Sequence, residues 1–243
     1  VIAPDQRGYS PNARPTFIKE YSLKHTSSDV LAIANAYNLQ RFHLVGHDWG
    51  SSVGWAFIAE HPERLYSWTS LSIPHMKAFQ EAYRSDFDQQ RKSKYIKFFN
   101  MPFFPELYLS YNGYNNLKNI WSAHDDKEKE AYLSVFRQSG ALRSALNWYR
   151  ANIGRHRNLT DHINFGIVEV PSLLIWGNMD MAIGRKSIVL NKQYMAGPYN
   201  LLELYAGHWL IQESFKDVSK AIIKHIKTYS LEYYEPQLGR KKK

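Results

Sequence analysis

Short apolar runs alternate with segments of helical periodicity over most of the chain. The apolar runs, each flanked by turn residues, cover residues 1–4, 41–45, 68–73, 172–177 and 201–205. Apolar positions recur at helical spacing in residues 21–37, 49–60, 184–195 and 214–228. This alternation is typical of βαβ units. We therefore predict an α/β fold with a mostly parallel sheet flanked by helices.

The pattern changes between residues 76 and 166. This stretch holds aromatic-rich and basic segments with amphipathic helical spacing, and no run within it resembles a strand. The strand-and-helix rhythm resumes after it. We interpret the stretch as a helical cap, residues 76–166, inserted into a core formed by residues 1–75 and 167–243.

The sequence Gly46-His47-Asp48-Trp49-Gly50 lies directly between a predicted strand and a predicted helix. This is the position of a nucleophile elbow, a strained turn that needs small flanking residues so that strand and helix can approach. The N–H of Trp49 would open the helix and favour negative charge at the reacting centre. Asp48 is therefore the candidate nucleophile, and an ordinary tight turn is the alternative.

Two further candidates follow later strands of the predicted sheet. Asp180 comes three residues after Gly177, just beyond the strand at residues 172–177, where ligand-facing groups of open α/β sheets gather. His208 follows the strand at residues 201–205 in the same way. The order nucleophile, acid, histidine is that of a hydrolase triad. A helix-capping role for Asp180 and a surface or core position for His208 are the alternatives.

The other histidines give no sign of a metal site. Six of them lie in polar or helical settings: His25, His61, His124, His156, His162 and His225. No pair has the spacing of metal ligands. We predict no metal and no cofactor.

Composition restricts the class of protein. With 243 residues, 44% of them hydrophobic, the chain can bury the core of one domain with an insertion. No stretch approaches the roughly 18 apolar residues of a membrane span, and the first residues lack the pattern of a signal peptide. The absence of cysteine excludes disulfides, a thiolate nucleophile and cysteine-ligated zinc. We expect a cytoplasmic protein without a membrane span.

The net charge of +9 raises the question of an anionic partner. Most of the positive charge is scattered among acidic residues, and the one dense run is the terminal stretch 240–243. We interpret that run as a solvated tail and predict no nucleic-acid partner. The chain begins with Val1, inside an apolar run and without an initiator methionine, so we expect a fragment or a processed form.

Six segments together resemble one known family. They are residues 5–10 (DQRGYS), 42–50 (FHLVGHDWG), 61–64 (HPER), 71–75 (LSIPH), 174–180 (LIWGNMD) and 207–209 (GHW). They are similar to the epoxide hydrolase branch of the α/β-hydrolase family, to which haloalkane and fluoroacetate dehalogenases are close relatives. The resemblance covers nearly the whole chain and is weakest between residues 112 and 140. It implies the α/β-hydrolase fold, with the family's first strands and its His-Gly-x-Pro loop absent before Val1.

The resemblance also nominates two tyrosines in the cap. In this family a pair of cap tyrosines hydrogen-bonds the oxirane oxygen. The family's Asn-Trp-Tyr-Arg step matches residues 147–150, which nominates Tyr149, and the segment that the other tyrosine opens matches residues 95–106, which nominates Tyr95. Simple packing is the alternative for both, because the chain holds 17 tyrosines.

The reaction that the resemblance implies is the opening of an epoxide to a vicinal diol. A carboxylate suits attack on saturated carbon, because the alkyl ester that forms can then be hydrolysed at its carbonyl. We expect Asp48 to form this ester, and His208, oriented by Asp180, to activate the water that hydrolyses it. The expected partners are a small apolar epoxide and water, and a homodimer is left open.

Two other functions stay open at this point. A haloalkane or haloacid dehalogenase would use the same nucleophile, and Trp49 and Trp148 would then be candidate donors to the leaving halide. Alternatively, a chain without the family's first strands would be a truncated, inactive hydrolase homologue.

Overall fold

The computed structural model describes residues 1–121, 123–153 and 163–230, and the chain divides into two compact units. Unit 1 comprises Val1–Asp29 and Ser93–His162, and unit 2 comprises Val30–Lys92 and Ile163–Lys243. The expected division, a core of residues 1–75 and 167–243 with a cap of residues 76–166, stays a prediction. The boundaries between the two compact units differ from those expected for core and cap: they lie after residues 29, 92 and 162.

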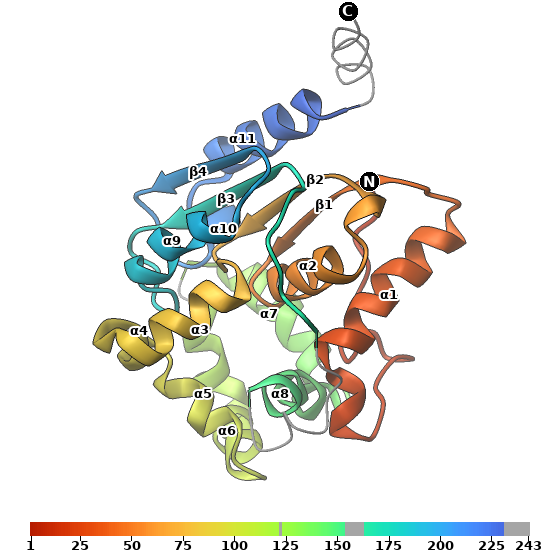
Figure 1. The fold of residues 1–243 in the computed structure, drawn as a ribbon. Helices are drawn as coiled ribbons and strands as arrows, with labels where there is room; N and C mark the ends of the chain where they lie inside the picture. Colours follow the sequence, from red (N-terminus) through yellow and green to blue (C-terminus); the bar gives the residue numbers. More distant parts are fainter. Residues whose placement is uncertain (122, 154–162, 231–243) are drawn as a thin grey trace, which may run out of the picture. The chain divides into compact units, whose positions relative to one another are not determined.

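Unit 2 contains a sheet of four parallel strands in the order β1-β2-β3-β4 (Figure 1). The strands are β1 (Phe42–His47), β2 (Leu65–Leu71), β3 (Ser172–Gly177) and β4 (Tyr199–Leu204). Every residue of β3 is buried, as a continuous apolar run in a parallel sheet requires. The parallel sheet with flanking helices confirms the predicted α/β fold.

Helices cover both faces of this sheet (Figure 1). α2 (Trp49–Glu60) packs against β1 and β2. α11 (Phe215–Thr228) packs against β2 and β3 from the opposite face, where α10 (Leu210–Glu213) completes an apolar cluster that includes Ile175 and Leu210. α2 ends at Glu60, before Pro62, because a residue that precedes proline is disfavoured in helical conformation.

Within the part of the chain that the structure describes, unit 2 also contains the second part of α1 (Leu23–Ala36) and five other helical segments. They are η2 (Pro62–Arg64), α3 (Met76–Ser85), α4 (Phe87–Lys92), α9 (Arg185–Asn191) and η5 (Lys192–Tyr194). α3 packs closely against α9, although about 100 residues separate them in the sequence. This contact explains why α3 and α4 belong to the unit that contains the sheet.

Among its described residues, unit 1 has helices as its regular structure. Its helices are η1 (Ile18–Tyr21), the first part of α1 (Leu23–Ala36), α5 (Lys94–Phe99), α6 (Phe104–Lys118), η3 (Asn119–Trp121), α7 (Asp126–Phe136) and α8 (Ala141–Asn152). α6 is broken by Tyr111–Tyr114, where three successive residues have positive φ. The hydroxyl groups of Tyr21, on η1, and Ser144, on α8, share a hydrogen bond of 2.8 Å, which helps to hold the two segments of the unit together.

Two strand predictions need correction. Residues 1–4 form no strand, because no neighbouring strand pairs with them within the described residues. β2 ends at Leu71 rather than at Ile73, since Ser72 turns the chain out of the sheet with a φ of 74°.

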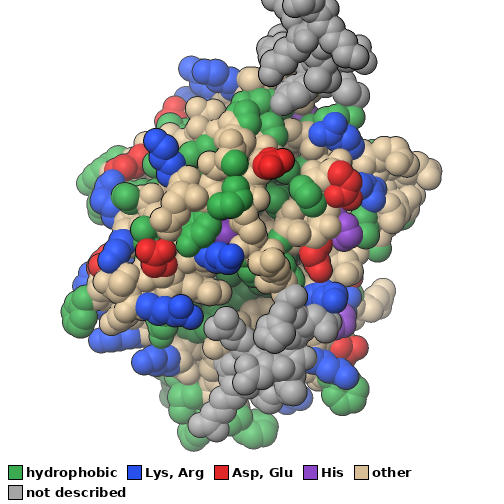
Figure 2. Space-filling model, viewed as in Figure 1, with side chains coloured by type: hydrophobic (Ala, Val, Ile, Leu, Met, Phe, Trp, Pro, Cys, Tyr) green, Lys and Arg blue, Asp and Glu red, His purple; other side chains and the backbone are tan. Residues whose placement is uncertain are grey.

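On the face shown in Figure 2, Lys and Arg side chains are interspersed with Asp and Glu. Within the described residues, no helix has the length and apolarity that crossing a membrane requires.

Candidate active site

Asp48 occupies a strained turn between β1 and α2. Its backbone has φ 51° and ψ −120°, a conformation that L-residues seldom adopt. The turn also brings strand and helix very close, because a Cβ placed on Gly46 would lie 2.4 Å from the carbonyl oxygen of Gly50. The sequence prediction of a tight turn with small flanking residues is therefore fulfilled in the geometry. The turn leaves the Asp48 side chain about one-third exposed.

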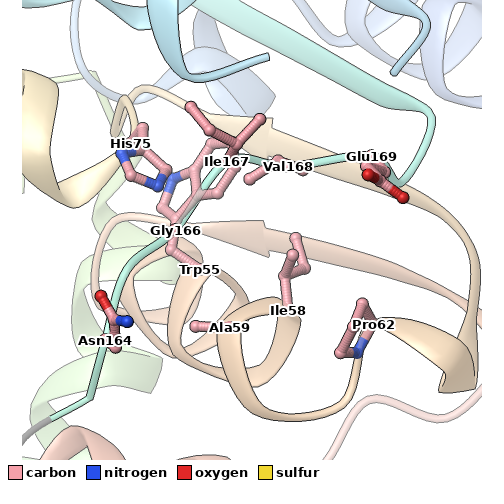
Figure 3. Close-up of a pocket in the computed structure, with 10 residues that line it drawn as sticks. All are labelled: Trp55, Ile58, Ala59, Pro62, His75, Asn164, Gly166, Ile167, Val168 and Glu169. Atoms are coloured by element: carbon pink, nitrogen blue, oxygen red, sulfur yellow. The ribbon is translucent and has the colours of Figure 1, made fainter. Parts of the chain in front are cut away.

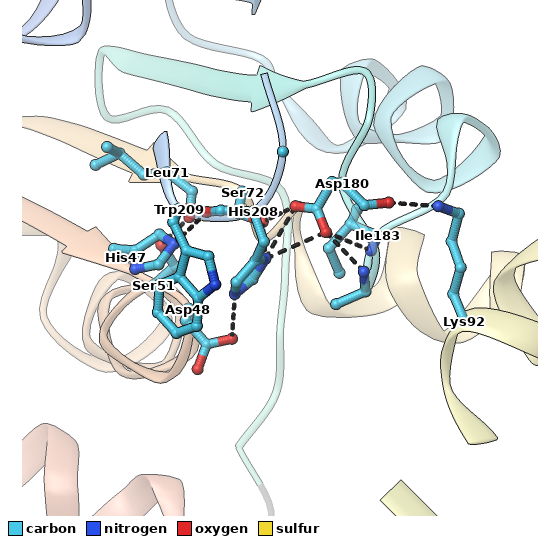
Figure 4. A network of polar contacts seen from close by, with 12 residues as sticks. His47, Asp48, Ser51, Leu71, Ser72, Lys92, Asp180, Ile183, His208 and Trp209 are labelled. Carbon is cyan, nitrogen blue, oxygen red and sulfur yellow. Dashed lines mark hydrogen bonds and ion pairs between the residues drawn. The ribbon is translucent and has the colours of Figure 1, made fainter. Parts of the chain in front are cut away.

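His208 lies between two carboxylates (Figure 4). Its Nε2 is 3.2 Å from Oδ1 of Asp48, and its Nδ1 is 3.0 Å from Oδ2 of Asp180. The three residues follow β1, β3 and β4, whose carboxyl ends meet at one edge because the strands are parallel. The structure thus brings together the three residues that the sequence nominated as nucleophile, acid and histidine.

Asp180 is completely buried, and its carboxylate has several donors. Oδ1 accepts hydrogen bonds from the backbone N–H groups of Ala182 (2.7 Å) and Ile183 (3.0 Å). Oδ2 accepts a short hydrogen bond from the hydroxyl of Ser72. A buried carboxylate with this many donors stays ionised and has a fixed orientation.

Ser72 is a site residue that sequence reasoning missed. Its hydroxyl lies 3.0 Å from Nδ1 of His208 as well as against Asp180. The sequence signal was hidden, because the apolar run predicts a strand over residues 68–73 and places Ser72 inside it. β2 in fact ends at Leu71, so Ser72 lies at the carboxyl end of the strand, where the ends of parallel strands converge.

The backbone around His208 is held by two further side chains. Glu213 accepts hydrogen bonds from the N–H groups on both sides of the histidine, at Gly207 (2.6 Å) and Trp209 (3.2 Å). His47 Nε2 lies 2.8 Å from the carbonyl oxygen of His208. These contacts involve main-chain atoms, for which the sequence carries no pattern.

The charges of the three residues are strongly coupled. Burial lowers the pKa of His208, but the hydrogen bonds and charges of Asp180 and Asp48 outweigh this and raise the pKa to about 10. Burial raises the pKa of Asp48, and the hydrogen bond and charge of His208 more than offset it, so that this pKa is lowered. Burial likewise raises the pKa of Asp180, and the hydrogen bond and charge of His208 more than offset it, so that this pKa is lowered too. The free site therefore holds an imidazolium between two carboxylates.

The nominated tyrosines lie side by side within unit 1. The rings of Tyr95, on α5, and Tyr149, on α8, have centroids 6.0 Å apart and an interplanar angle of 81°. Both rings also contact Phe99 edge to face. Trp148 has a different environment: it is fully buried, and its indole N–H donates to the carbonyl oxygen of Arg7 at 3.0 Å. This N–H is already used in packing within unit 1.

Trp49 is the first residue of α2, directly after the candidate nucleophile Asp48. Its backbone N–H forms a hydrogen bond to the Asp48 carboxylate that contributes to lowering the pKa of that group. A helix N-terminus favours negative charge through its unpaired N–H groups. The Trp49 N–H is thus placed to stabilise negative charge that develops on the Asp48 side chain.

A separate cavity of about 160 Å³ lies along the second half of α2 (Figure 3). It is lined mainly by apolar residues of α2 and of the segment before β3, among them Trp55, Ile58 and Ile167. None of Asp48, Asp180 and His208 lines it. Because the coupled charges and the strained turn mark reactive chemistry, we place the candidate site at the triad and not at this cavity.

The family model described as alpha/beta hydrolase fold matches residues 1–214. The chain is 30% identical to the AB hydrolase superfamily protein YfhM of Bacillus subtilis, over 93% of this chain and 80% of that protein. It is 32% identical to human Epoxide hydrolase 4, over 91% of this chain and 63% of that protein. The chain thus spans less than two thirds of the human relative's length.

A solved structure of an epoxide hydrolase mutant from Bacillus megaterium is similar to this chain with a TM-score of 0.79. The match covers 88% of this chain and 79% of that one, at 20% sequence identity. At this identity the likeness bears on the fold alone. Together with the sequence matches, it confirms the predicted α/β-hydrolase fold and the kinship with epoxide hydrolases.

Proposed function

The chain belongs to the α/β-hydrolase fold family, and from this premise we propose that it hydrolyses epoxides to vicinal diols through a covalent ester on Asp48. The observation that carries the proposal is a carboxylate on the nucleophile elbow, 3.2 Å from Nε2 of His208. Sequence relatives named as epoxide hydrolases, in human and in other organisms, support the choice of substrate class.

A carboxylate on this turn selects the kind of bond that is attacked. An oxygen of Asp48 forms a bond to an epoxide carbon while the bond from that carbon to the ring oxygen breaks. The product is an alkyl ester, which water can open at the carbonyl carbon. A serine nucleophile would instead form an ether, which has no such carbonyl. Asp48 therefore suits displacement at saturated carbon followed by ester hydrolysis.

The leaving oxygen needs a proton donor as its charge develops. Tyr95 and Tyr149 supply hydrogen bonds to it, and one phenol transfers a proton to give the free hydroxyl. Their adjacency within unit 1, with ring centroids 6.0 Å apart, supports a paired role.

Formation of the ester changes the charge on His208. The free site holds an imidazolium because two carboxylates raise its pKa. Once Asp48 is esterified, one of those negative charges is gone, so the pKa of His208 falls and the ring releases its proton, which restores the phenol that protonated the leaving oxygen. Neutral Nε2 then accepts a proton from the attacking water, while Asp180 holds the ring through Nδ1. The Trp49 N–H stabilises the oxyanion that forms on the ester. This oxyanion collapses, the bond from the carbonyl carbon to the diol oxygen breaks, and the departing oxygen takes the proton from His208. The Asp48 carboxyl group then returns a proton to His208, which regenerates the carboxylate and the imidazolium.

The covalent route predicts where the oxygen of water goes. In a single turnover in oxygen-18 water, the attacking water adds to the ester carbonyl, so the label enters the Asp48 carboxylate and the diol receives an unlabelled oxygen. Mass analysis of the peptide that contains Asp48 measures the label. Asp48→Asn should lower the rate of diol formation by about 10⁶-fold, as removal of a covalent nucleophile does. The proposal fails if the wild type forms diol with no label in Asp48.

Halide displacement is the competing function, and it would need N–H donors to the leaving halide. The indole N–H of Trp148 donates to Arg7, so it is not available as a second halide donor. An inactive, truncated homologue is the other alternative. Incubation with styrene oxide and with a bromoalkane, measured as diol and as released bromide, separates all three functions.

A further inference from the structure

We propose that Gln89 and Lys92 of α4 are positioning residues that hold the Asp180 loop so that His208 can activate water. This inference rests on the function proposed above and deepens it. It assigns a role in one step of the reaction to side chains that touch neither substrate nor histidine.

The loop from Asp180 to Gly184 determines where the acidic side chain points. It joins β3, which ends at Gly177, to α9, which begins at Arg185. The Asp180 carboxylate binds the N–H groups of Ala182 and Ile183 in its own loop. The direction of the carboxylate therefore follows the path of the loop backbone.

Gln89 binds this backbone with both ends of its amide. Its Nε2 donates to the carbonyl oxygen of Ala182 at 2.8 Å, and its Oε1 accepts from the N–H of Gly184 at 2.8 Å. The side chain is completely buried. Loss of the amide would leave a buried carbonyl and a buried N–H without these partners, and the loop would have to move to satisfy them.

Lys92 binds the loop one helical turn later on the same helix. Its ammonium group donates a short hydrogen bond to the backbone carbonyl oxygen of Asp180 itself (Figure 4). Residues three apart share a helix face, so α4 presents both side chains to the loop together. Asp86 fixes the start of α4 by accepting a hydrogen bond from the N–H of Gln89 at 3.1 Å.

This arrangement predicts which step depends on α4. Asp180 acts on His208 across 3.0 Å, and a displacement of the order of 1 Å in an active site can cost about 10²-fold in rate. His208 is needed when water attacks the ester, whereas attack of Asp48 on the epoxide proceeds without a base. Loss of the contacts made by α4 should therefore slow ester hydrolysis and spare ester formation.

The test compares Gln89→Met with Gln90→Met. Both replace a glutamine of α4 by an apolar side chain of similar length, but Gln90 is exposed and lies outside the loop contacts. In Gln89→Met, ester hydrolysis should slow by about 10- to 100-fold, and the ester should accumulate on Asp48 in the mass of the quenched protein. Ester formation should stay within about 3-fold of the wild-type rate, and Gln90→Met should match the wild type in both steps. Equal slowing of both steps in Gln89→Met would show a merely structural role.

A second pair of variants covers the case in which Gln89→Met does not fold. Lys92→Met should slow ester hydrolysis by about 3- to 10-fold, and Lys92→Arg, which keeps a donor, should restore most of the rate. Failure of Lys92→Met to affect hydrolysis would overturn the role of Lys92.

A spectroscopic measurement separates this inference from the proposed function. The Nδ1 proton of His208, bonded to the buried Asp180, should give a far-downfield proton resonance that His208→Gln removes. Lys92→Met should shift or broaden that resonance in the resting protein, where no turnover occurs, and Gln90→Met should not. If the wild type forms no diol, the proposed function fails and this resonance still decides the inference. An unchanged resonance in Lys92→Met and Gln89→Met would refute it.

Discussion

His75 shows how one buried side chain can make stability depend on pH. Its ring is 1% exposed and stacks on Tyr194, with centroids 4.5 Å apart. Nδ1 accepts a hydrogen bond from the N–H of Lys77, and the ring also bonds to the backbone of Gly166. Burial, with a smaller contribution from the charge of Lys77, lowers the pKa of His75 to about 4. The folded protein therefore keeps this ring neutral, while the unfolded chain takes up a proton near pH 6.5.

This difference predicts a loss of stability on acidification. Between about pH 6.5 and pH 4 the unfolded state binds the additional proton, so the free energy of unfolding falls as the pH falls, by up to about 3 kcal/mol from His75. Below pH 4 the folded state is protonated too, and this contribution stops changing. His75→Phe keeps an aromatic ring against Tyr194 but cannot titrate. Urea unfolding at pH 7 and at pH 4.5 should show a smaller decrease for His75→Phe than for the wild type, and equal decreases would contradict the assignment.

The site residues differ in how far sequence alone could identify them. Asp48, Asp180 and His208 were found because each follows a strand, and parallel strands bring their carboxyl ends together. Glu213 and Gln89 could not be found in this way, since they act on backbone N–H and carbonyl groups of the loops. Such contacts depend on the path of the chain in space, which local spacing does not record.

The contact of α2 with the sheet depends on a glycine inside the helix. A Cβ placed on Gly54 would lie 1.9 Å from Cη2 of Trp68, in the middle of β2. Trp68 is completely buried, so its ring has no free space into which it can move. The predicted bounds of α2 match the observed ones, because the glycine-flanked turn at Asp48 marks its start and Pro62 follows its end. The prediction of a strand at residues 1–4 was wrong, because a strand also needs a neighbouring strand to pair with, and an apolar run contains no information about that neighbour.

Gly54→Ala should therefore destabilise the protein, although alanine is the better helix former. Overpacking of a full core costs about 1–3 kcal/mol, which exceeds the roughly 1 kcal/mol that alanine gains over glycine in a helix. Chemical unfolding measures the difference. Gly166→Ala is the control, because a Cβ at Gly166 meets no atom within 4 Å and its φ is not positive. A Gly54→Ala variant as stable as Gly166→Ala would show that α2 can move away from the sheet.

At the scale of the whole molecule, each unit is assembled from two separate stretches of chain. In unit 1 the early segment is held to α8 through side chains: the hydroxyl groups of Tyr21 and Ser144 share a hydrogen bond, and the N–H of Leu23 donates to Asn152 at 2.8 Å. The hydroxyl of Tyr21 also lies 2.7 Å from the carbonyl oxygen of Pro15. The ring is completely buried, so this hydroxyl is a buried member of the set of hydrogen bonds that join the two segments.

Tyr21→Phe should loosen unit 1 without loosening the sheet. Removing one buried hydroxyl that binds two partners costs about 1–2 kcal/mol. Hydrogen exchange followed by mass spectrometry should show faster exchange in α8 and unchanged exchange in β3. Equal acceleration in α8 and β3 would mean that the two units open together and do not form separate cooperative units.

The distribution of the triad along the chain limits what any piece of this protein can do. Asp48 precedes the long helical stretch between β2 and β3, whereas Asp180 and His208 follow it. A cut anywhere in that stretch leaves the candidate nucleophile on one fragment and both of its partners on the other. Neither fragment carries all three side chains, so the proposed reaction in a split form requires the two pieces to reassemble the sheet.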